Sequence, residues 1–246
     1  MFSELINFIL IVSLTAIQSI VGVGVLVIGT PTLLLMDISI IEIMNYLLPI
    51  SIFTSLLNII IIKKQNIFFY NFDRLKIFFK VCVPSIFLGL IILKYLDKLI
   101  NFDYVVSFII ILTLVLRERI SKIFKKISKR TNKILLVIIG IIHGITNSGG
   151  SLLSIMIINL NKSKKKSRSE ITLFYFILAL LQFFLFYLIF GLKQNINQFY
   201  IIILYIIIGV VLGNVLLKFT KQGLYQNLVY ILALISSSTL ILKNII

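Results

Sequence analysis

Charged and redox-active side chains are scarce in this chain of 246 residues. It has eight carboxylates, one histidine and one cysteine, and 13% of its residues are charged, whereas an average soluble protein carries about 25%. The single cysteine, Cys82, excludes an internal disulfide and a cysteine-based zinc or iron–sulfur centre. The carboxylates fall in loops or at the ends of apolar segments, so we expect no acidic metal cage at membrane depth.

Signatures of catalysis are also missing. The chain contains no G-x-S-x-G, H-E-x-x-H or Walker motif, the patterns typical of serine hydrolases, zinc proteases and nucleotide-driven proteins. We therefore predict a protein that is not an enzyme and that has no catalytic residues, no metal site and no cofactor.

Apolar residues, in contrast, dominate. They make up 60% of the chain and raise its mean hydropathy to +1.13, which predicts an all-α integral membrane protein. A hydrocarbon core about 30 Å thick needs about 20 helical residues. Runs of that scale give eight segments: 5–36, 38–62, 77–93, 102–116, 134–160, 171–190, 199–217 and 228–242.

The net charge of +16 raises nucleic acid as a partner. Every Lys and Arg falls between the apolar segments, however, as the positive-inside rule predicts for a membrane protein, so we expect no nucleic acid. If all eight segments cross, the two faces carry 15 and 9 basic residues. If the first and fifth segments each enter and return as broken hairpins, the faces carry 20 and 4. The second topology is favoured.

That topology makes two four-segment halves that are inverted relative to each other, a common construction in transporters. We assign the first membrane repeat to 1–118, a basic connector to 119–133 and the second repeat to 134–246. The three parts are expected to form one integrated transmembrane domain.

Similar residues recur in the two halves. "QSIVGVGVLVI" (18–28) aligns with "HGITNSGGSLL" (143–153), and "PSIFLG" aligns with "GVVLGN" near the end of each half. The second alignment matches Ser85 and Gly89 with Gly209 and Gly213. Both pairs are separated by three residues, a spacing that allows close packing of helices in lipid, and we expect that role for them.

The first and fifth segments resemble the glycine-rich motifs of the TauE/SafE sulfite-exporter family of membrane permeases. The resemblance lies in "GVGVLVIGTP" (22–31), which is similar to the family's first motif, and "TNSGGSLL" (146–153), which is similar to its repeated copy. It extends to the layout of eight segments in two repeats. The resemblance implies transport of sulfite, sulfonates or related organosulfur anions. The chain departs from the motif at Val25, Leu26, Asn147 and Ser151, where the family often has glycine.

Physical chemistry also favours an anion at these two motifs. A break inside a membrane segment leaves backbone N–H groups at the start of the second half-helix, with partial positive charge. Irregular backbone at membrane depth is tolerated only inside protein or beside a water-filled cavity. Two such helix starts meeting near the midplane are expected to bind an anion without any buried Lys or Arg.

The predicted substrate-binding residues are all in the two motifs or beside them. His143 is the only group within a segment that titrates near neutral pH, which makes proton coupling one interpretation and a hydrogen-bonded core histidine the other. Capping of the broken helices is the alternative role for the polar members. The set is Gln18, Gly22, Gly24, Thr30, Pro31, Thr32, His143, Thr146, Asn147, Ser148, Gly149, Gly150 and Ser151.

Together these observations predict a multi-pass secondary transporter of the cell membrane. It is expected to carry a small anion, sulfite or another organosulfur anion, by alternating access at the two breaks. Two alternatives stay open: a channel-like or carrier protein for a different small solute, and a non-transporting membrane subunit. The expected partners are the anion and the lipid bilayer, and the sequence leaves homo-oligomerisation open.

Overall fold

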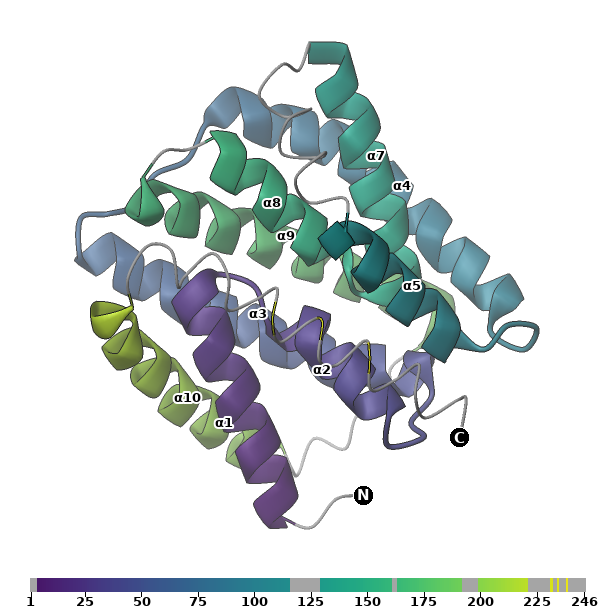
Figure 1. Cartoon of the computed structure of the whole chain (residues 1–246), viewed down its shortest axis with the longest axis horizontal. Coiled ribbons are helices and arrows are strands. Elements are labelled where there is room, and N and C mark those ends of the chain that lie inside the picture. Colours follow the sequence, from purple (N-terminus) through teal and green to yellow (C-terminus); the bar gives the residue numbers. More distant parts are fainter. Residues whose placement is uncertain are drawn as a thin grey trace.

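The computed structural model describes residues 4–115, 129–160, 163–191 and 199–220, with positions 231, 234 and 238. Every regular element in these parts is a helix, so the predicted all-α class is confirmed (Figure 1). The eighth predicted segment, apart from three positions, and most of the connector lie outside the described residues. The helices are α1 (Glu4–Val21), α2 (Val25–Leu34), α3 (Ile40–Lys64), α4 (Phe72–Leu96), α5 (Phe102–Val115), α7 (Lys129–Thr146), α8 (Gly149–Leu160), α9 (Lys164–Phe190) and α10 (Phe199–Phe219).

Five of these helices are long and apolar enough to cross a bilayer: α1, α3, α4, α9 and α10. Their outer faces carry large exposed apolar side chains, among them Leu188 and Phe219. Such faces are suited to lipid rather than to water, because the acyl chains of lipids are as apolar as these side chains. The prediction of a multi-pass integral membrane protein is confirmed.

The two longest predicted segments each contain two helices. Segment 5–36 comprises α1 and α2, which are separated by residues 22–24. Segment 134–160 comprises the apolar part of α7 and then α8, separated by Asn147 and Ser148. We call residues 22–24 the first break and Asn147–Ser148 the second break. α7 begins at Lys129, inside the predicted connector.

The sixth predicted segment begins too late. The sequence predicts a loop at 162–168 and a helix from 171, whereas α9 begins at Lys164. Two charged residues in its first turns are buried in protein instead of solvated. Arg168 is 5% exposed, and Glu170 is fully buried and accepts hydrogen bonds of 2.8 and 3.0 Å from Arg74. Glu170 lies at the start of its segment as predicted, but it is buried against a partner instead of solvated, which a hydropathy window cannot identify.

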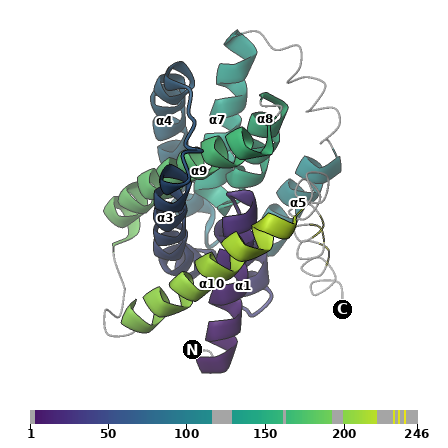
Figure 2. The same ribbon diagram turned by 90° about the vertical axis from the view of Figure 1, so that its left-hand side faces the viewer.

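Helices from the two ends of the chain pack closely through small residues. In α10, a Cβ at Gly209 would lie 2.7 Å from the Val12 carbonyl, and one at Gly213 would lie 2.7 Å from Ser19 Cβ. Because both positions advance along α1 in the same order, α1 and α10 run in the same direction. They lie next to each other in Figure 1, and α10 crosses in front of α1 in Figure 2.

The same arrangement joins α4 to α7. A Cβ at Gly89 would lie 2.5 Å from the Ile141 carbonyl, and Gly140 faces Ser85 at 2.6 Å. Both expected small-residue pairs thus lie at helix contacts. In each case the helix of the third predicted segment of one repeat packs on the first helix of the other.

α3 and α9 form the antiparallel centre of the molecule. Gln182 Nε2 donates to Met44 Sδ (3.7 Å) at one level, and Arg168 Nη2 donates to Asn58 Oδ1 (3.2 Å) two heptads away. Between these two contacts both helices advance by fourteen residues, so one face of α9 stays against one face of α3 over four turns.

Basic residues gather at one end of the bundle, which we call the basic end. The turn between α3 and α4 meets the start of α9 there: Phe69 N donates to Ser169 Oγ (2.8 Å) and Ser169 Oγ donates to the Phe69 carbonyl (3.0 Å). Lys164 donates to the Thr220 carbonyl just after α10. The basic residues of 63–80, 162–168 and 218–221 therefore share one end.

The opposite end carries carboxylates, and we call it the acidic end. A hollow of about 280 Å³ lies between the α2–α3 turn and the α4–α5 turn, with Asp37, Asp97 and Asp103 in its lining. It is away from both helix breaks. The excess of Lys and Arg at the basic end follows the positive-inside pattern that orients membrane proteins.

Candidate functional site

The first break reverses the chain inside the bundle. Gly22 takes a φ of +94°, a left-handed conformation that favours glycine, and its N–H donates to the Gln18 carbonyl (2.7 Å). A side chain at Gly22 would meet Ile171 at 2.8 Å. α2 then returns beside α1, because Gly24 lies against Gln18 and Gly29 lies against Leu14. The first break is the tip of a helical hairpin.

Gln18 holds this tip to α3. Its Nε2 donates to the Ser51 carbonyl (3.0 Å) and to Ser55 Oγ (2.9 Å), while its Oε1 accepts from the Val25 N–H (3.0 Å) at the start of α2. Gln18 is 1% exposed. It therefore caps α2 from within the same hairpin, which is the capping role weighed as the alternative to ligand contact.

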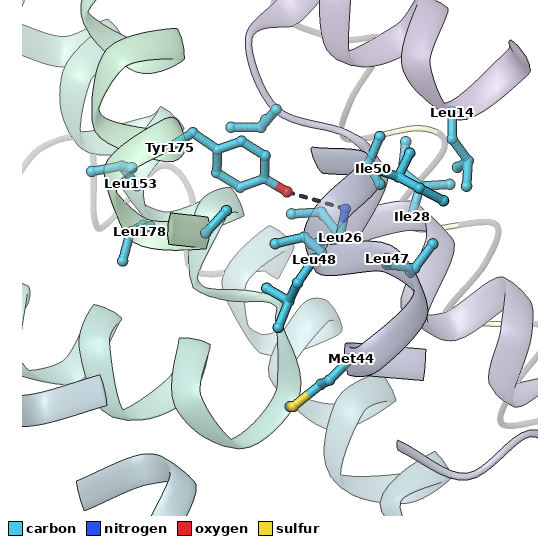
Figure 3. Close-up of a cluster of buried hydrophobic side chains, with 14 of the residues drawn as sticks. Leu14, Leu26, Ile28, Met44, Leu47, Leu48, Ile50, Leu153, Tyr175 and Leu178 are labelled. Atoms are coloured by element: carbon cyan, nitrogen blue, oxygen red, sulfur yellow. Dashed lines mark hydrogen bonds between the residues drawn. The ribbon is translucent and has the colours of Figure 1, made fainter. Parts of the chain in front are cut away.

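A second cap comes from the other half of the chain. The Leu26 N–H donates to the Tyr175 hydroxyl at 3.1 Å (Figure 3). Figure 3 shows Tyr175 reaching from α9 to the first turn of α2 between apolar side chains. The first two N–H groups of α2 are therefore satisfied by side chains in this conformation, not exposed as the sequence predicts.

The second break is shaped by Asn147. Its φ of 61° is one that asparagine tolerates better than most residues. Ser148 Oγ donates to the Thr146 carbonyl (3.1 Å), and Ser151 Oγ donates to the Ser148 carbonyl (2.7 Å). Thr146, Ser148 and Ser151 thus satisfy the local backbone. Any Cβ at Gly149 would lie 2.5 Å from the Ile139 carbonyl, so α8 starts in close contact with α7.

The second break contacts α2 across the bundle. Asn147 Nδ2 donates to Thr30 Oγ1 at 3.2 Å, although the two residues are 117 positions apart. Asn147 Oδ1 accepts from Gln182 Nε2 (2.8 Å), which also donates to the His143 carbonyl (3.0 Å). Asn147, Thr30 and Gln182 are fully buried. A continuous series of hydrogen bonds, which we call the link, thus connects α2, α7 and α9.

His143 is fully buried beside this link. The Asn147 backbone lies near its ring, but neither ring nitrogen makes a hydrogen bond of normal geometry with a described residue. The ring centroid lies 6.3 Å from that of Tyr175. Gln182 Oε1 is likewise buried without such a partner. Buried polar atoms are usually satisfied, so these atoms mark a place where a further polar group fits.

Thr32 and Pro31 take no part in the link. Thr32 is half-buried and donates to the Ile28 carbonyl of its own helix (2.8 Å). Pro31 lies inside α2, where its ring packs in the core. Gly24 and Gly150 allow close packing because they lack a side chain. A Cβ at Gly24 would lie 2.9 Å from the Gln18 backbone nitrogen, and a Cβ at Gly150 would collide with the Tyr175 ring.

Arg168 is the main residue that the sequence prediction missed. Its Nε and Nη2 donate to the Ser19 carbonyl at the end of α1 (3.0 and 2.7 Å), and Nη2 also donates to Asn214 Oδ1 (2.8 Å). Arg168 is thus a buried arginine beside the first break that the sequence prediction did not include. Two features of the sequence distinguish this residue: Arg168 is the only arginine of "KSKKKSR", and it is the basic residue of that run nearest the apolar segment.

Arg168, Tyr175 and Gln182 lie seven residues apart on one face of α9, and all three are buried. The first binds the end of α1, the second binds the start of α2, and the third binds the end of α7. We call these three residues the α9 stripe. It connects one helix to three of the four helix ends that flank the breaks.

Among the residues that the structure describes, no group of three His, Cys, Asp or Glu side chains is placed to hold a metal. The arrangement offers amide, hydroxyl and imidazole groups at two helix interruptions. These groups suit recognition of a small polar solute better than bond making or breaking.

Comparison with known proteins identifies the family. The model described as "Sulfite exporter TauE/SafE" matches residues 7–240 of the 246. No protein with a curated description and no solved structure matches the chain. The family consists of membrane permeases, not enzymes. The match spans nearly the whole chain, and the chain therefore belongs to the sulfite exporter TauE/SafE family of multi-pass membrane transporters.

Proposed function

We propose that this protein is a secondary transporter of sulfite or another small organosulfur anion, with its substrate site at the two breaks. The observation that carries the proposal is the hydrogen bond from Asn147 to Thr30, which brings the two glycine-rich motifs of the chain to one place. Family membership supports the substrate class.

The chemistry of the site favours an oxyanion. Asn147 Nδ2, Gln182 Nε2 and the N–H groups at the start of α2 are donors, and an oxyanion offers only acceptors. The start of α2 also carries the positive end of the helix dipole. Arg168, buried at the end of α1, adds a full positive charge to the same region. The remaining predicted residues shape the backbone around these donors.

The transport mechanism that we propose is alternating access between two inverted repeats, 1–118 and 134–246, joined by the connector 119–133. The direction of the helix contacts supports it. The α1–α2 hairpin turns back near the basic end, because Ser19 lies beside Asn58, six residues before α3 ends there. The α7–α8 hairpin has the opposite direction, since α7 runs parallel to α4 toward the acidic end and α8 returns to α9.

This topology gives a first prediction. The α3–α4 turn and the start of α9 lie on the same face of the membrane, and the α4–α5 turn lies on the other. Single cysteines replacing Asn66 and Lys165 should react with a membrane-impermeant maleimide from the cytoplasmic side only, and a cysteine replacing Leu99 from the outside only. The native Cys82 is buried and does not interfere. Labelling of positions 66 and 165 from opposite faces would contradict the hairpin topology.

The function itself is tested with purified protein in liposomes. Radiolabelled sulfite should enter protein-containing liposomes faster than empty ones, and unlabelled thiosulfate and sulfonates should be compared with sulfate as competitors. Failure of all these anions to be transported, together with transport of a cation, would overturn the proposal. Continuous single-channel currents would instead indicate the channel-like alternative.

A second prediction concerns Asn147. Its change to Gly keeps the positive φ but removes the side chain that joins Thr30 to Gln182. Sulfite uptake should fall at least about tenfold, because loss of a buried hydrogen-bonded amide leaves its partners unsatisfied. Asn66→Gly is the matched control: Asn66 also has a positive φ, of 54°, but is exposed in the α3–α4 turn. Equal losses in the two variants would assign the effect to backbone conformation and not to the site.

A further inference from the structure

The start of α2 is held by two side chains of different origin. Gln18 Oε1 accepts from the Val25 N–H at 3.0 Å, and the Tyr175 hydroxyl accepts from the Leu26 N–H at 3.1 Å. Free N–H groups at the start of a helix are the groups that bind anion oxygens in proteins. Each of the two side chains therefore stands where an oxygen of a bound anion would stand.

The two caps differ in how they are attached. Gln18 belongs to the same hairpin as Val25, seven residues away, and is tied to α3 by hydrogen bonds to Ser51 and Ser55. Tyr175 belongs to the other half of the chain, 149 residues from Leu26. A cap within the hairpin moves with it, whereas a cap from the opposite half is broken when the halves shift. Tyr175 is thus the cap that separates from the start of α2 when the two halves shift.

The Tyr175 ring lies between the two breaks. On one side its hydroxyl meets α2 (Figure 3), and on another its ring fills the space over Gly150, where any Cβ would collide with it. Its ring centroid is 6.3 Å from that of His143. One side chain therefore occupies the space between the first turn of α2 and the first turn of α8.

Unsatisfied polar atoms lie next to this ring. Both ring nitrogens of His143 are fully buried and make no hydrogen bond of normal geometry with any residue that the structure describes. The same holds for Gln182 Oε1, seven residues further along α9 from Tyr175. Because buried polar atoms nearly always have partners, these atoms point independently to a polar ligand that contacts this region. The helix start and the His143 imidazole both lie close to the same tyrosine.

We propose that Tyr175 is an internal occupant of an oxyanion position at the start of α2, and that a substrate oxygen displaces its hydroxyl from the Leu26 N–H. The inference rests on the proposed function and adds a specificity-determining residue to it. In the conformation described here the position is occupied by the protein's own phenol. An anion binds by taking over the Leu26 N–H, and its remaining oxygens face the His143 imidazole.

The test compares Tyr175→Phe with wild type and with Tyr46→Phe. Tyr46 is the matched control because its hydroxyl, on α3, donates to Asn7 Oδ1 near the other end of α1, away from both breaks. Removal of the Tyr175 hydroxyl removes a competitor, so Tyr175→Phe should bind sulfite with a dissociation constant about three- to tenfold lower than wild type. Tyr46→Phe should bind sulfite as wild type does. Monodisperse elution in detergent establishes that each variant is folded.

Hydrogen exchange gives a readout that needs no ligand. The Leu26 amide should exchange faster in Tyr175→Phe than in wild type or Tyr46→Phe, and sulfite should restore its protection. Equal sulfite affinity in wild type and Tyr175→Phe, or weaker binding by Tyr175→Phe, would overturn the inference and leave the proposed function standing. Absence of oxyanion binding by all three proteins would instead refute the proposed function, and this inference with it.

Discussion

Replacement of Gly144 by leucine is expected to abolish the folded transporter. A Cβ at this position would lie 2.5 Å from the Ile86 carbonyl and 3.0 Å from Gly89 Cα, both of them backbone atoms of α4. A change of rotamer cannot relieve a contact between Cβ and backbone, so α7 and α4 have to separate. Overpacking of a core costs about 1–3 kcal/mol and more where the backbone must move. Helix association in lipid depends on such close packing. The substitution therefore disrupts the α4–α7 contact, which orients the second break.

The measurement is thermal stability in detergent, scored as the fraction of monodisperse protein after heating. The midpoint should fall by about 10 °C or more, or no folded protein should be recovered. Val137→Leu is the control, because Val137 lies on the same helix and is 37% exposed on its outer face. A Gly144→Leu protein that is as stable as Val137→Leu would show that α4 and α7 do not pack as described.

Loss of Arg168 is expected to have the second largest effect. In Arg168→Met the Ser19 carbonyl loses two donors, and Asn58 and Asn214 each lose a charged donor to their amide oxygen. A buried group left without its partner costs about 1–3 kcal/mol, and more when the bond is to a charged group. The end of α1 and the first break are then no longer fixed to α9. We expect sulfite uptake per folded molecule to fall more than about tenfold, which corresponds to 1.4 kcal/mol.

Two further variants separate charge from geometry. Lys165→Met removes a neighbouring positive charge that is exposed at the basic end, and uptake should be unchanged. Arg168→Lys keeps the charge but lacks the planar fork that donates from Nε and Nη2 to one carbonyl, so it should recover only part of the activity. Full activity in Arg168→Lys would reduce the role of Arg168 to that of a positive charge. Full activity in Arg168→Met would remove it from the site.

The class of protein and the approximate position of most helices could be predicted from the sequence, because both depend on apolar run length. α3, α5 and α10 each begin and end within two residues of their predicted segments. α4 is longer than its predicted segment, by five residues at its start and three at its end. α9 was placed seven residues too late since a hydropathy window treats Arg168 and Glu170 as solvated. Their partners, Ser19 and Arg74, are about 100 residues or more away, and nothing in the local sequence identifies them.

The candidate site was predicted in part for the same reason. Asn147 and Gln18 stand beside glycines in a polar interruption of apolar sequence, a pattern visible without a structure. Tyr175 is one of ten tyrosines and lies in an uninterrupted apolar segment, so only its hydrogen bond to Leu26 distinguishes it. The contact of Asn147 with Thr30 depends on how two hairpins fit together, which periodicity and composition do not specify.

The pairing of α1 with α10 has a consequence for the order in which the protein is assembled. α7 follows α4 closely along the chain, whereas Gly209 and Gly213, which α1 packs against, are near the other end. At a translation rate of about 5–20 residues per second, α1 waits roughly 10–40 s for its partner. During that interval its small-residue face must be covered by lipid or by the insertion machinery. The contact between α1 and α10 therefore forms only after α3, α4, α7 and α9 have been synthesised.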